Sequence, residues 1–271
     1  MNLIECAGVG FAYPGGVQAL AGVQLSIASG ERLAIIGQNG SGKTTLVRHF
    51  NGLLRPASGS VTVSGRDTRS ARVAELARIV GLSFQDPDRQ IFSGSVRSEL
   101  EFGPRNLGLR GEALEAAVAA ALESVGLTAD QQTNPYDLGQ SRRKLLSIAS
   151  VLAMGTPVVV LDEPTTGQDA AGVRAIEAIV ERLAAEGRTV IAVSHDLRFV
   201  AESFERVVVM RAGRIELDGA PSEVFAESAW YTLRGTNLEP PYAARAGAAL
   251  RLGSTPTQAA VVAALKERYL M

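Results

Sequence analysis

The chain has 271 residues, of which 46% are hydrophobic and 20% charged, and its formal net charge at pH 7 is -1. This length suits one large domain or a core domain with a small appendage, and the composition is typical of a water-soluble globular protein. The near-zero net charge excludes a chain-wide electrostatic footprint for nucleic acid, and no apolar run reaches the ~18 residues that a membrane span needs.

The N-terminal segment MNLIECAGVGFAYPGG (1–16) lacks the charged flank and apolar block of a signal peptide. Its Cys6 is the single cysteine of the chain, which rules out an internal disulfide and fits a reducing cytosol. Over residues 2–36, short apolar runs alternate with Gly and Ser, as β-strands and turns do. The run LAIIG (33–37) predicts a compact strand that leads directly into a glycine-rich loop.

That loop, GQNGSGKT (37–44), fits the pattern G-x-x-x-x-G-K-[ST] without a mismatch, and TTLVRHFNGL (44–53) continues it with helical spacing. Its glycines let successive backbone N–H groups form a nest for phosphates, and the helix N-terminus adds positive potential. Lys43 is expected to reach the β- and γ-phosphates, and the Thr44 hydroxyl to bind Mg2+. A chance glycine-rich turn is the alternative, which this context disfavours. The candidate nucleotide-binding residues here are Gly37, Asn39, Gly40, Ser41, Gly42, Lys43, Thr44 and Thr45.

Helical patterns dominate from about residue 88. The stretch GEALEAAVAAALESVG (111–126) places apolar side chains on one face and ends at a glycine, as a helix C-terminus often does. The run LLSIASVLAM (145–154) predicts a mostly apolar, buried helix. We therefore expect a helical insertion over roughly residues 88–155.

The segment PVVVLDE (157–163) is a continuous apolar run of strand length that ends in two carboxylates. Such a run suits a central parallel strand that is covered on both faces. Asp162 is expected to hold the metal ion of a phosphate-loop site. Glu163 is expected to polarise a water beyond the γ-phosphate and act as general base, the alternative being an ordinary surface glutamate.

An amphipathic helix pattern (171–187) is followed by another buried strand, TVIAVSHD (189–196). His195 ends this strand and is expected at the carboxyl edge of the sheet, where ligands bind in open α/β folds. There it is expected to hydrogen-bond a γ-phosphate. His49, in the helix after the phosphate loop, is interpreted as structural.

Strands and helices alternate along the chain, which predicts an α/β sheet. Residues 234–241 have the composition of a linker, and the segments 243–254 and 255–270 are expected to form two short helices. We therefore expect an α/β domain over residues 1–233 and a small helical extension over residues 234–271.

Together, these motifs resemble the ATP-binding subunits of ABC transporters over about residues 2–230. GQNGSGKTT is similar to Walker A, VVVLDE to Walker B and TTGQD to the D-loop, whose aspartate is Asp169. SHD carries the switch histidine. The resemblance makes Gln85 the Q-loop glutamine, a metal ligand that also faces the membrane partner. It makes Tyr13 the aromatic residue that stacks on adenine, with Phe11 as the fallback.

The resemblance implies a P-loop NTPase (RecA-like) core with an N-terminal antiparallel β region, a helical subdomain and a C-terminal helical extension. It implies ATP and Mg2+ as cofactors, with Thr44, Gln85 and Asp162 as metal ligands. It also implies an ATPase whose catalytic residues are Glu163 and His195.

A narrower resemblance lies in FQDPDRQIFSGSV (84–96) followed by ELEFGPRNLGL (99–109), which are similar to the ATPases of energy-coupling factor importers, including the cobalt and nickel type. It implies a motor for uptake of a vitamin or a transition-metal ion, peripheral on the cytoplasmic face of the cell membrane. The implied partners are a transmembrane coupling subunit, a substrate-binding membrane subunit that selects the cargo, and a second ATPase subunit, with no nucleic acid. In this group a C-terminal appendage helps to pair the ATPases.

The stretch LGQSRRK (138–144) departs from the signature loop LSGGQ, which in this family acts on the nucleotide of a second subunit. Such a loop needs an exposed helix N-terminus, a hydroxyl and small residues, so that N–H groups approach a γ-phosphate. Ser141 supplies a hydroxyl, and Arg142 and Arg143 add positive charge. A gapless alignment places five residues on the signature, of which only the leucine matches: Leu138, Gly139, Gln140, Ser141 and Arg142.

Two assemblies stay open. In the first, the chain forms a homodimer and LGQSRRK is a working variant of the signature. In the second, it pairs with a non-identical ATPase subunit whose signature completes the productive site. The second is favoured, because a homodimer would need both sites to tolerate the substitutions.

Three other functions compete with the motor. Soluble ABC ATPases that act on DNA, chromosomes or ribosomes usually carry a long coiled coil or two cassettes in one chain, and this sequence shows neither. A module that only holds ATP is disfavoured by Glu163 and His195, although the unusual signature mildly favours it. A small-molecule kinase would not need the Q-loop, D-loop and switch histidine together.

Overall fold

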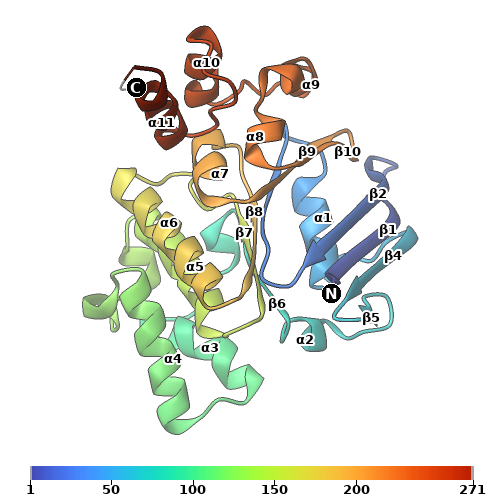
Figure 1. The fold of residues 1–271 in the computed structure, drawn as a ribbon. Coiled ribbons are helices and arrows are strands. Elements are labelled where there is room, and N and C mark those ends of the chain that lie inside the picture. Colours follow the sequence, from blue (N-terminus) through green and yellow to red (C-terminus); the bar gives the residue numbers. More distant parts are fainter. Residues whose placement is uncertain (1, 270–271) are drawn as a thin grey trace.

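The computed structural model describes residues 2–269 and contains two β-sheets (Figure 1). Met1, Leu270 and Met271, at the ends of the expected domain and extension, lie outside the described residues. The first sheet has the strand order β2-β1-β4-β5, and the second has the order β10-β9-β3-β8-β7-β6. The strands are β1 (Asn2–Ala12), β2 (Gln18–Ala28), β3 (Arg32–Ile36), β4 (Ser58–Val63), β5 (Arg66–Asp67), β6 (Val80–Ser83), β7 (Val158–Asp162), β8 (Thr189–Val193), β9 (Arg206–Arg211) and β10 (Arg214–Gly219).

In the six-stranded sheet, neighbouring strands from β9 to β6 run parallel, and β10 adds an antiparallel edge. Strands β7 and β8 are buried along their whole length. Their unbroken apolar sequences fit this position, because both faces of the sheet are covered. Parallel strands bring their carboxyl ends to one edge, so the residues that follow β3, β6, β7 and β8 meet there.

Helices α1 to α7 lie between strands in the chain, α8 to α11 follow β10, and four 3-10 turns lie among the helices of residues 2–269. The helices are α1 (Lys43–Phe50), α2 (Val73–Leu76), α3 (Val96–Leu107), α4 (Gly111–Ser124), α5 (Gln140–Ala153), α6 (Ala170–Ala185), α7 (Leu197–Ser203), α8 (Pro221–Val224), α9 (Trp230–Gly235), α10 (Tyr242–Ala249) and α11 (Gln258–Tyr269). The turns are η1 (Pro87–Arg89), η2 (Thr128–Asp130), η3 (Pro135–Asp137) and η4 (Glu227–Ala229).

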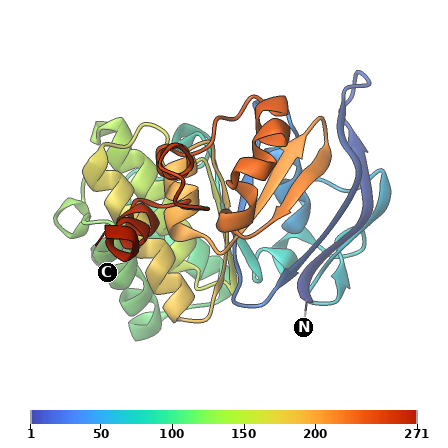
Figure 2. The same cartoon turned by 45° about the horizontal axis from the view of Figure 1, so that its top comes forward.

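Two apolar cores lie on opposite faces of the six-stranded sheet. Along β3, Leu33 and Ile35 face the core that contains Phe50 of α1 and the antiparallel sheet, whereas Ala34 and Ile36 face the core under helices α3 to α7. This alternation follows from the period of two along a strand. Figure 2 shows the resulting layers, with the antiparallel sheet on one side and the green and yellow helices on the other.

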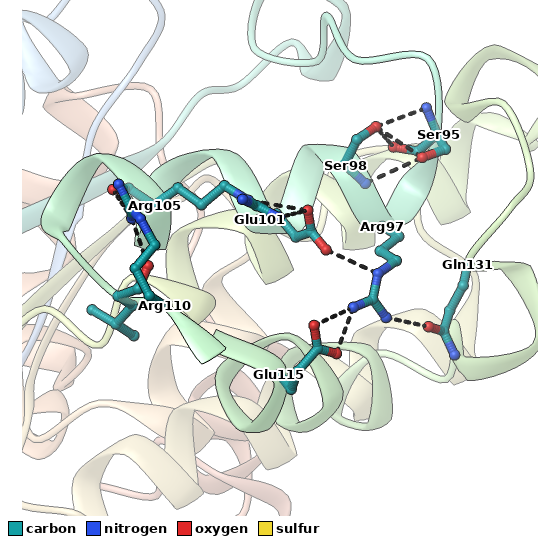
Figure 3. Close-up of polar contacts among 9 residues, drawn as sticks. Ser95, Arg97, Ser98, Glu101, Arg105, Arg110, Glu115 and Gln131 are labelled. Carbon is teal, nitrogen blue, oxygen red and sulfur yellow. Dashed lines mark hydrogen bonds and ion pairs between the residues drawn. The ribbon is translucent and has the colours of Figure 1, made fainter. Parts of the chain in front are cut away.

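Helices α3, α4 and α5 form one cluster in the region where the helical insertion was expected. Arg97 of α3 joins three partners there (Figure 3). Its Nε lies 2.9 Å from Glu101 Oε1, and its terminal nitrogens donate to Glu115 of α4 at 2.6 Å and to Gln131 at 3.2 Å. Of these three bonds, the one to Glu115 links α3 to α4, and because the Arg97 side chain is 30% exposed each ion pair contributes little to stability.

The predicted α/β architecture is confirmed, with its N-terminal antiparallel sheet, inserted helices and C-terminal helices. The junction differs from a plain linker, because α9 reaches Gly235 and the side chains of Leu233, Thr236 and Leu238 are buried. Apolar burial therefore holds this segment on the domain. Within residues 2–269, no helix is long and apolar enough to cross a membrane.

Cys6 lies on β1 and is 4% exposed, and burial raises the pKa of its thiol to about 12. Because the thiolate is the reactive form, we expect the folded chain to resist alkylation by iodoacetamide at pH 8. The chain unfolded in guanidinium chloride should be alkylated under the same conditions. Mass spectrometry of quenched samples measures the modified fraction, and rapid alkylation of the folded chain would contradict this expectation.

Candidate functional site

The candidate site lies at the carboxyl edge of the parallel strands. The phosphate loop follows β3, Gln85 follows β6, Asp162 and Glu163 lie at the end of β7, and His195 follows β8. The pairings β3–β8, β8–β7 and β7–β6 make these strands neighbours. The sheet topology thus brings together side chains that are far apart in the sequence.

Two glycines in the phosphate loop are required by close approaches of the backbone. Gly37 has a φ of +150°, and a Cβ there would lie 2.3 Å from Met210 O. Gly42 has a φ of +104°, and a Cβ there would lie 2.4 Å from Ala19 O. Both contacts are too short for any side chain, so the loop can take this shape only with glycine at these positions. The buried Ser41 Oγ in the same loop has no hydrogen-bond partner among the described residues.

Lys43 and Thr44 are the first two residues of α1, and the Lys43 side chain folds back onto the phosphate loop. Lys43 Nζ donates to Gly37 O at 2.7 Å and to Gln38 O at 3.0 Å. Burial lowers the pKa of Lys43, and the nearby carboxylates of Glu163 and Asp162 oppose that shift. The ammonium is therefore a partly desolvated cation, which favours an anionic ligand beside it.

Two short contacts fix the residues at the ends of β7 and β8: one joins Asp162 to α1, and the other joins Glu163 to His195. Thr44 Oγ1 donates to Asp162 Oδ1 at 3.1 Å, and burial raises the pKa of the Asp162 carboxyl. His195 Nδ1 lies 2.7 Å from Glu163 Oε2. Glu163 is 5% exposed and has a φ of +49°, an uncommon conformation for a residue with a side chain. Backbone outliers of this kind occur often at functional sites.

A cleft of about 430 Å3 runs along the phosphate loop. Tyr13 lies at its wall, and its hydroxyl is 3.1 Å from Thr45 Oγ1. Phe11 instead packs edge-on against Tyr13 and against the ring of the buried His49, at 5.0 and 5.1 Å between ring centroids. The cleft is lined by Tyr13, Val17, Gln18, Ala19, Asn39, Gly40, Ser41, Gly42, Lys43, Thr44, Thr45, Gln85 and Glu163.

These residues fit a phosphorylated ligand accompanied by a hard divalent cation. The glycine nest, the orphaned Ser41 hydroxyl and the Lys43 ammonium are suited to phosphate oxygens. The paired Thr44 hydroxyl and Asp162 carboxylate are oxygen donors of the kind that Mg2+ binds, together with phosphates and waters.

The signature-like stretch lies at the start of α5, where Gly139 is the exposed N-cap residue. Ser141 and Gln168 are joined by two bonds, since Ser141 Oγ donates to Gln168 Oε1 at 2.9 Å and Gln168 Nε2 donates to Ser141 O at 3.1 Å. Arg142 pairs with Asp130. The hydroxyl and the cation expected to face an anion are therefore engaged within the chain.

Asp169 caps α6, because its Oδ1 accepts the backbone N–H of Gly172 at 2.8 Å. Gln140 is exposed and begins α5. Neither Asp169 nor Gln140 is among the described residues that line the cleft of their own chain. This separation is compatible with residues that act on a second subunit.

Sequence reasoning missed Lys144 and Gln90. Lys144 Nζ donates to three backbone carbonyls near the site, and burial lowers its pKa to about 8. Gln90 Oε1 accepts the N–H of Phe84 at 2.9 Å, and its Nε2 donates to Ser147 O at 2.7 Å. The available signal was the position of Lys144 directly before the apolar run 145–154 on the same helix, where a buried cation needs partners.

A family model described as ABC transporter matches residues 20–166. The energy-coupling factor transporter ATP-binding protein EcfA of Methanothermobacter thermautotrophicus is 40% identical over 228 residues, which are 83% of this chain and 73% of that protein. An ABC transporter ATP-binding protein of Caldanaerobacter subterraneus is 41% identical over 239 residues, which are 88% of this chain but only 42% of that longer relative.

Among solved structures, cbiO1 from Clostridium perfringens is described as part of the ABC transporter complex cbiONQ. It shares 35% sequence identity with this chain at a TM-score of 0.76. The similarity covers 92% of this chain and 99% of that one, so the fold extends through most of both molecules.

Proposed function

The chain belongs to the ATP-binding family of ABC transporters, whose members hydrolyse ATP to power transport, and we propose that it is the motor subunit of an energy-coupling-factor-type importer. The convergence of Lys43, Thr44, Asp162, Glu163 and His195 on one sheet edge carries the motor assignment. Similarity to EcfA and to cbiO1 supports the importer class. The proposed cargo is a vitamin or a transition-metal ion.

In this proposal the phosphate loop binds the phosphates of ATP, and Tyr13 stacks on the adenine. Lys43 contacts the β- and γ-phosphates as a point charge. Thr44, Asp162 and Gln85 hold Mg2+, which neutralises charge on the phosphate oxygens when it is bound. The short contact between Thr44 and Asp162 and the place of Gln85 on the cleft wall support this set.

Glu163 is proposed to orient a water and accept its proton, and His195 to hold Glu163 and contact the γ-phosphate. The 2.7 Å contact between His195 Nδ1 and Glu163 Oε2 supports this pairing. The two residues have different surroundings, because the Glu163 side chain is 7% exposed and the His195 side chain is 62% exposed. A nearly buried base with an exposed partner suits a site that a second subunit completes.

The signature-like residues Gly139, Gln140, Ser141 and Arg142, with Asp169, are proposed to act on the nucleotide of the second ATPase subunit. We favour a non-identical subunit. In this chain the Ser141 hydroxyl is bonded to Gln168 and Arg142 is paired with Asp130. Both groups would have to exchange partners before they contacted a γ-phosphate, which would weaken a site built from this loop.

The chain is proposed to lie at the cytoplasmic face of the cell membrane. Its membrane partner is proposed to dock in a second cleft of this chain, of about 450 Å3. Gln85 lines this cleft as well as the first one, which would connect partner movement to the nucleotide. A substrate-binding membrane subunit would complete the importer. The second cleft is lined by Arg48, Leu53, Leu54, Phe84, Gln85, Asp86 and Arg89.

The importer assignment is tested by co-purifying the tagged chain from membranes of its own cell and rebuilding the captured complex in vesicles. We expect ATP-driven accumulation of a vitamin or of a labelled Co2+ or Ni2+ ion, and its loss when Glu163→Gln replaces the native chain. ATP-driven export, or capture of the chain without any membrane subunit, would refute the importer.

The assembly is tested by light scattering on Glu163→Gln, which should bind ATP without hydrolysing it. If the partner is non-identical, we expect this variant alone to remain a monomer at saturating Mg-ATP. A dimer that forms only with nucleotide would show that LGQSRRK binds a γ-phosphate and would establish the homodimer.

A further inference from the structure

Lys144 is a buried cation that joins three of the motifs described above. It is the fifth residue of α5, which begins at the signature-like loop, and it is 2% exposed. Its Nζ donates to Phe84 O at 2.8 Å, to Gln85 O at 2.9 Å and to Asp162 O at 2.9 Å. An ammonium group has three N–H donors, so each of them has one acceptor.

These carbonyls lie just beyond the point where two strands separate. The parallel pairing of β6 with β7 ends at Ser83 and Leu161. Phe84 and Asp162 are the next residues, and Lys144 bonds both of their carbonyls. The side chain thus continues the link between the strands where the regular ladder has ended.

The residues held in this way carry two of the proposed metal ligands. Gln85 belongs to the segment after β6, and Asp162 is the last residue of β7. Gln90 ties the same segment to α5 through Ser147 and Ser150, at 2.7 and 2.9 Å, but these bonds do not reach β7. The Lys144 bonds therefore set the spacing between the Gln85 and Asp162 backbones.

The Lys144 ammonium has backbone carbonyls as its direct partners, with carboxylates only nearby. Asp162, Glu163 and Asp86 are the carboxylates that favour its charge. Hydrogen bonds from a charged donor are short and directional, so a lysine here constrains backbone position more tightly than an apolar side chain would.

We propose that Lys144 is a positioning residue that holds Gln85 and Asp162 at the separation needed to share one Mg2+ ion, and thereby determines how strongly Mg2+ enhances ATP binding. This inference rests on the metal ligands given under the proposed function. Because Lys144 lies on the signature helix, a shift of α5 would also change this separation. The signature loop and the metal site are thus mechanically linked within one chain.

The test compares the affinity of a fluorescent, non-hydrolysable ATP analogue in excess Mg2+ with its affinity in EDTA, using the full chain. Lys144→Met keeps an unbranched side chain but removes the three donors. We expect it to reduce the Mg2+-dependent gain in affinity by roughly tenfold or more, the range seen when groups that orient metal ligands are removed. Affinity in EDTA should change little, because the three Lys144 hydrogen bonds go to Phe84, Gln85 and Asp162 and not to the phosphate loop.

Conservative variants and a matched control separate positioning from general damage. Lys144→Arg should retain most of the gain, and Lys144→Gln, with two donors and no charge, should fall between Arg and Met. Lys266→Met, the same change on the exposed α11, should behave like the wild type. If Lys144→Met does not fold, the Arg and Gln variants carry the comparison.

Two results would overturn the inference, and they differ in what else they overturn. If the wild-type chain gains affinity with Mg2+ and the Met or Gln variant gains as much, Lys144 does not position the ligands and the proposed function stands. If the wild-type chain gains nothing from Mg2+, the metal ligands of the proposed function are wrong, and the role of Lys144 with them.

Discussion

Glu163→Gln is expected to lower the rate of ATP hydrolysis by about 100-fold or more while ATP still binds, because general-base groups contribute about 10²- to 10⁴-fold. The amide has nearly the same shape as the carboxylate, but it cannot accept a proton from water. The native residue is almost buried and has a φ of +49°, so a substitution of the same shape avoids disturbing its backbone. Nucleotide affinity should therefore stay close to that of the wild type.

The measurement is the first-order rate of ATP cleavage in a single turnover, with the captured transporter at a concentration above that of ATP. Glu186→Gln is the matched control, since Glu186 is 46% exposed and lies on the surface between Arg182 and Arg188. It should hydrolyse ATP at the wild-type rate. A Glu163→Gln enzyme within a few fold of the wild-type rate would remove Glu163 from the role of base.

Lys43→Met is expected to act earlier, by weakening ATP binding about 10- to 100-fold. Charge-assisted hydrogen bonds contribute about 1.5–3 kcal/mol, and each 1.4 kcal/mol corresponds to a factor of ten in affinity. Lys43 is 6% exposed, and burial lowers its pKa because it disfavours the charged form. Phosphates bound beside the ammonium would offset this cost, so the lysine should contribute strongly to ATP binding. Methionine fills similar space and removes a buried charge, so the folded state should remain stable.

Isothermal titration with Mg-ATP gives the affinity, and thermal unfolding without nucleotide checks the fold. Lys266→Met is the control, because it makes the same change on the exposed α11. An unchanged Kd for Lys43→Met would show that the ligand does not occupy the phosphate loop. The two variants together separate binding from chemistry. Lys43→Met should lose affinity for ATP, and Glu163→Gln should lose the rate of hydrolysis.

The sequence by itself determined the architecture and the phosphate loop, because both depend on local patterns. The backbone nest is formed by contiguous residues, so its glycines and Lys43 appear as one motif in GQNGSGKT. Unbroken apolar runs predicted the buried strands β7 and β8, and the polar residues at or just after their ends predicted Asp162 and His195 as edge residues. Alternating strands and helices predict a parallel sheet, and in such a sheet the carboxyl ends of the strands lie at one edge, where ligands bind.

The tertiary structure alone decided which side chains support that site. The three acceptors of Lys144 lie 18 to 60 residues away in the chain, and Gln168 lies 27 residues from Ser141. These contacts depend on how α5 packs against neighbouring segments. The spacing of apolar residues within one helix or strand does not predict that packing. Contacts with α1 likewise placed Tyr13 on the cleft wall, beside Thr45, and Phe11 against His49. Local patterns specify elements and loops, whereas the burial of one polar group against another is decided only when distant segments meet.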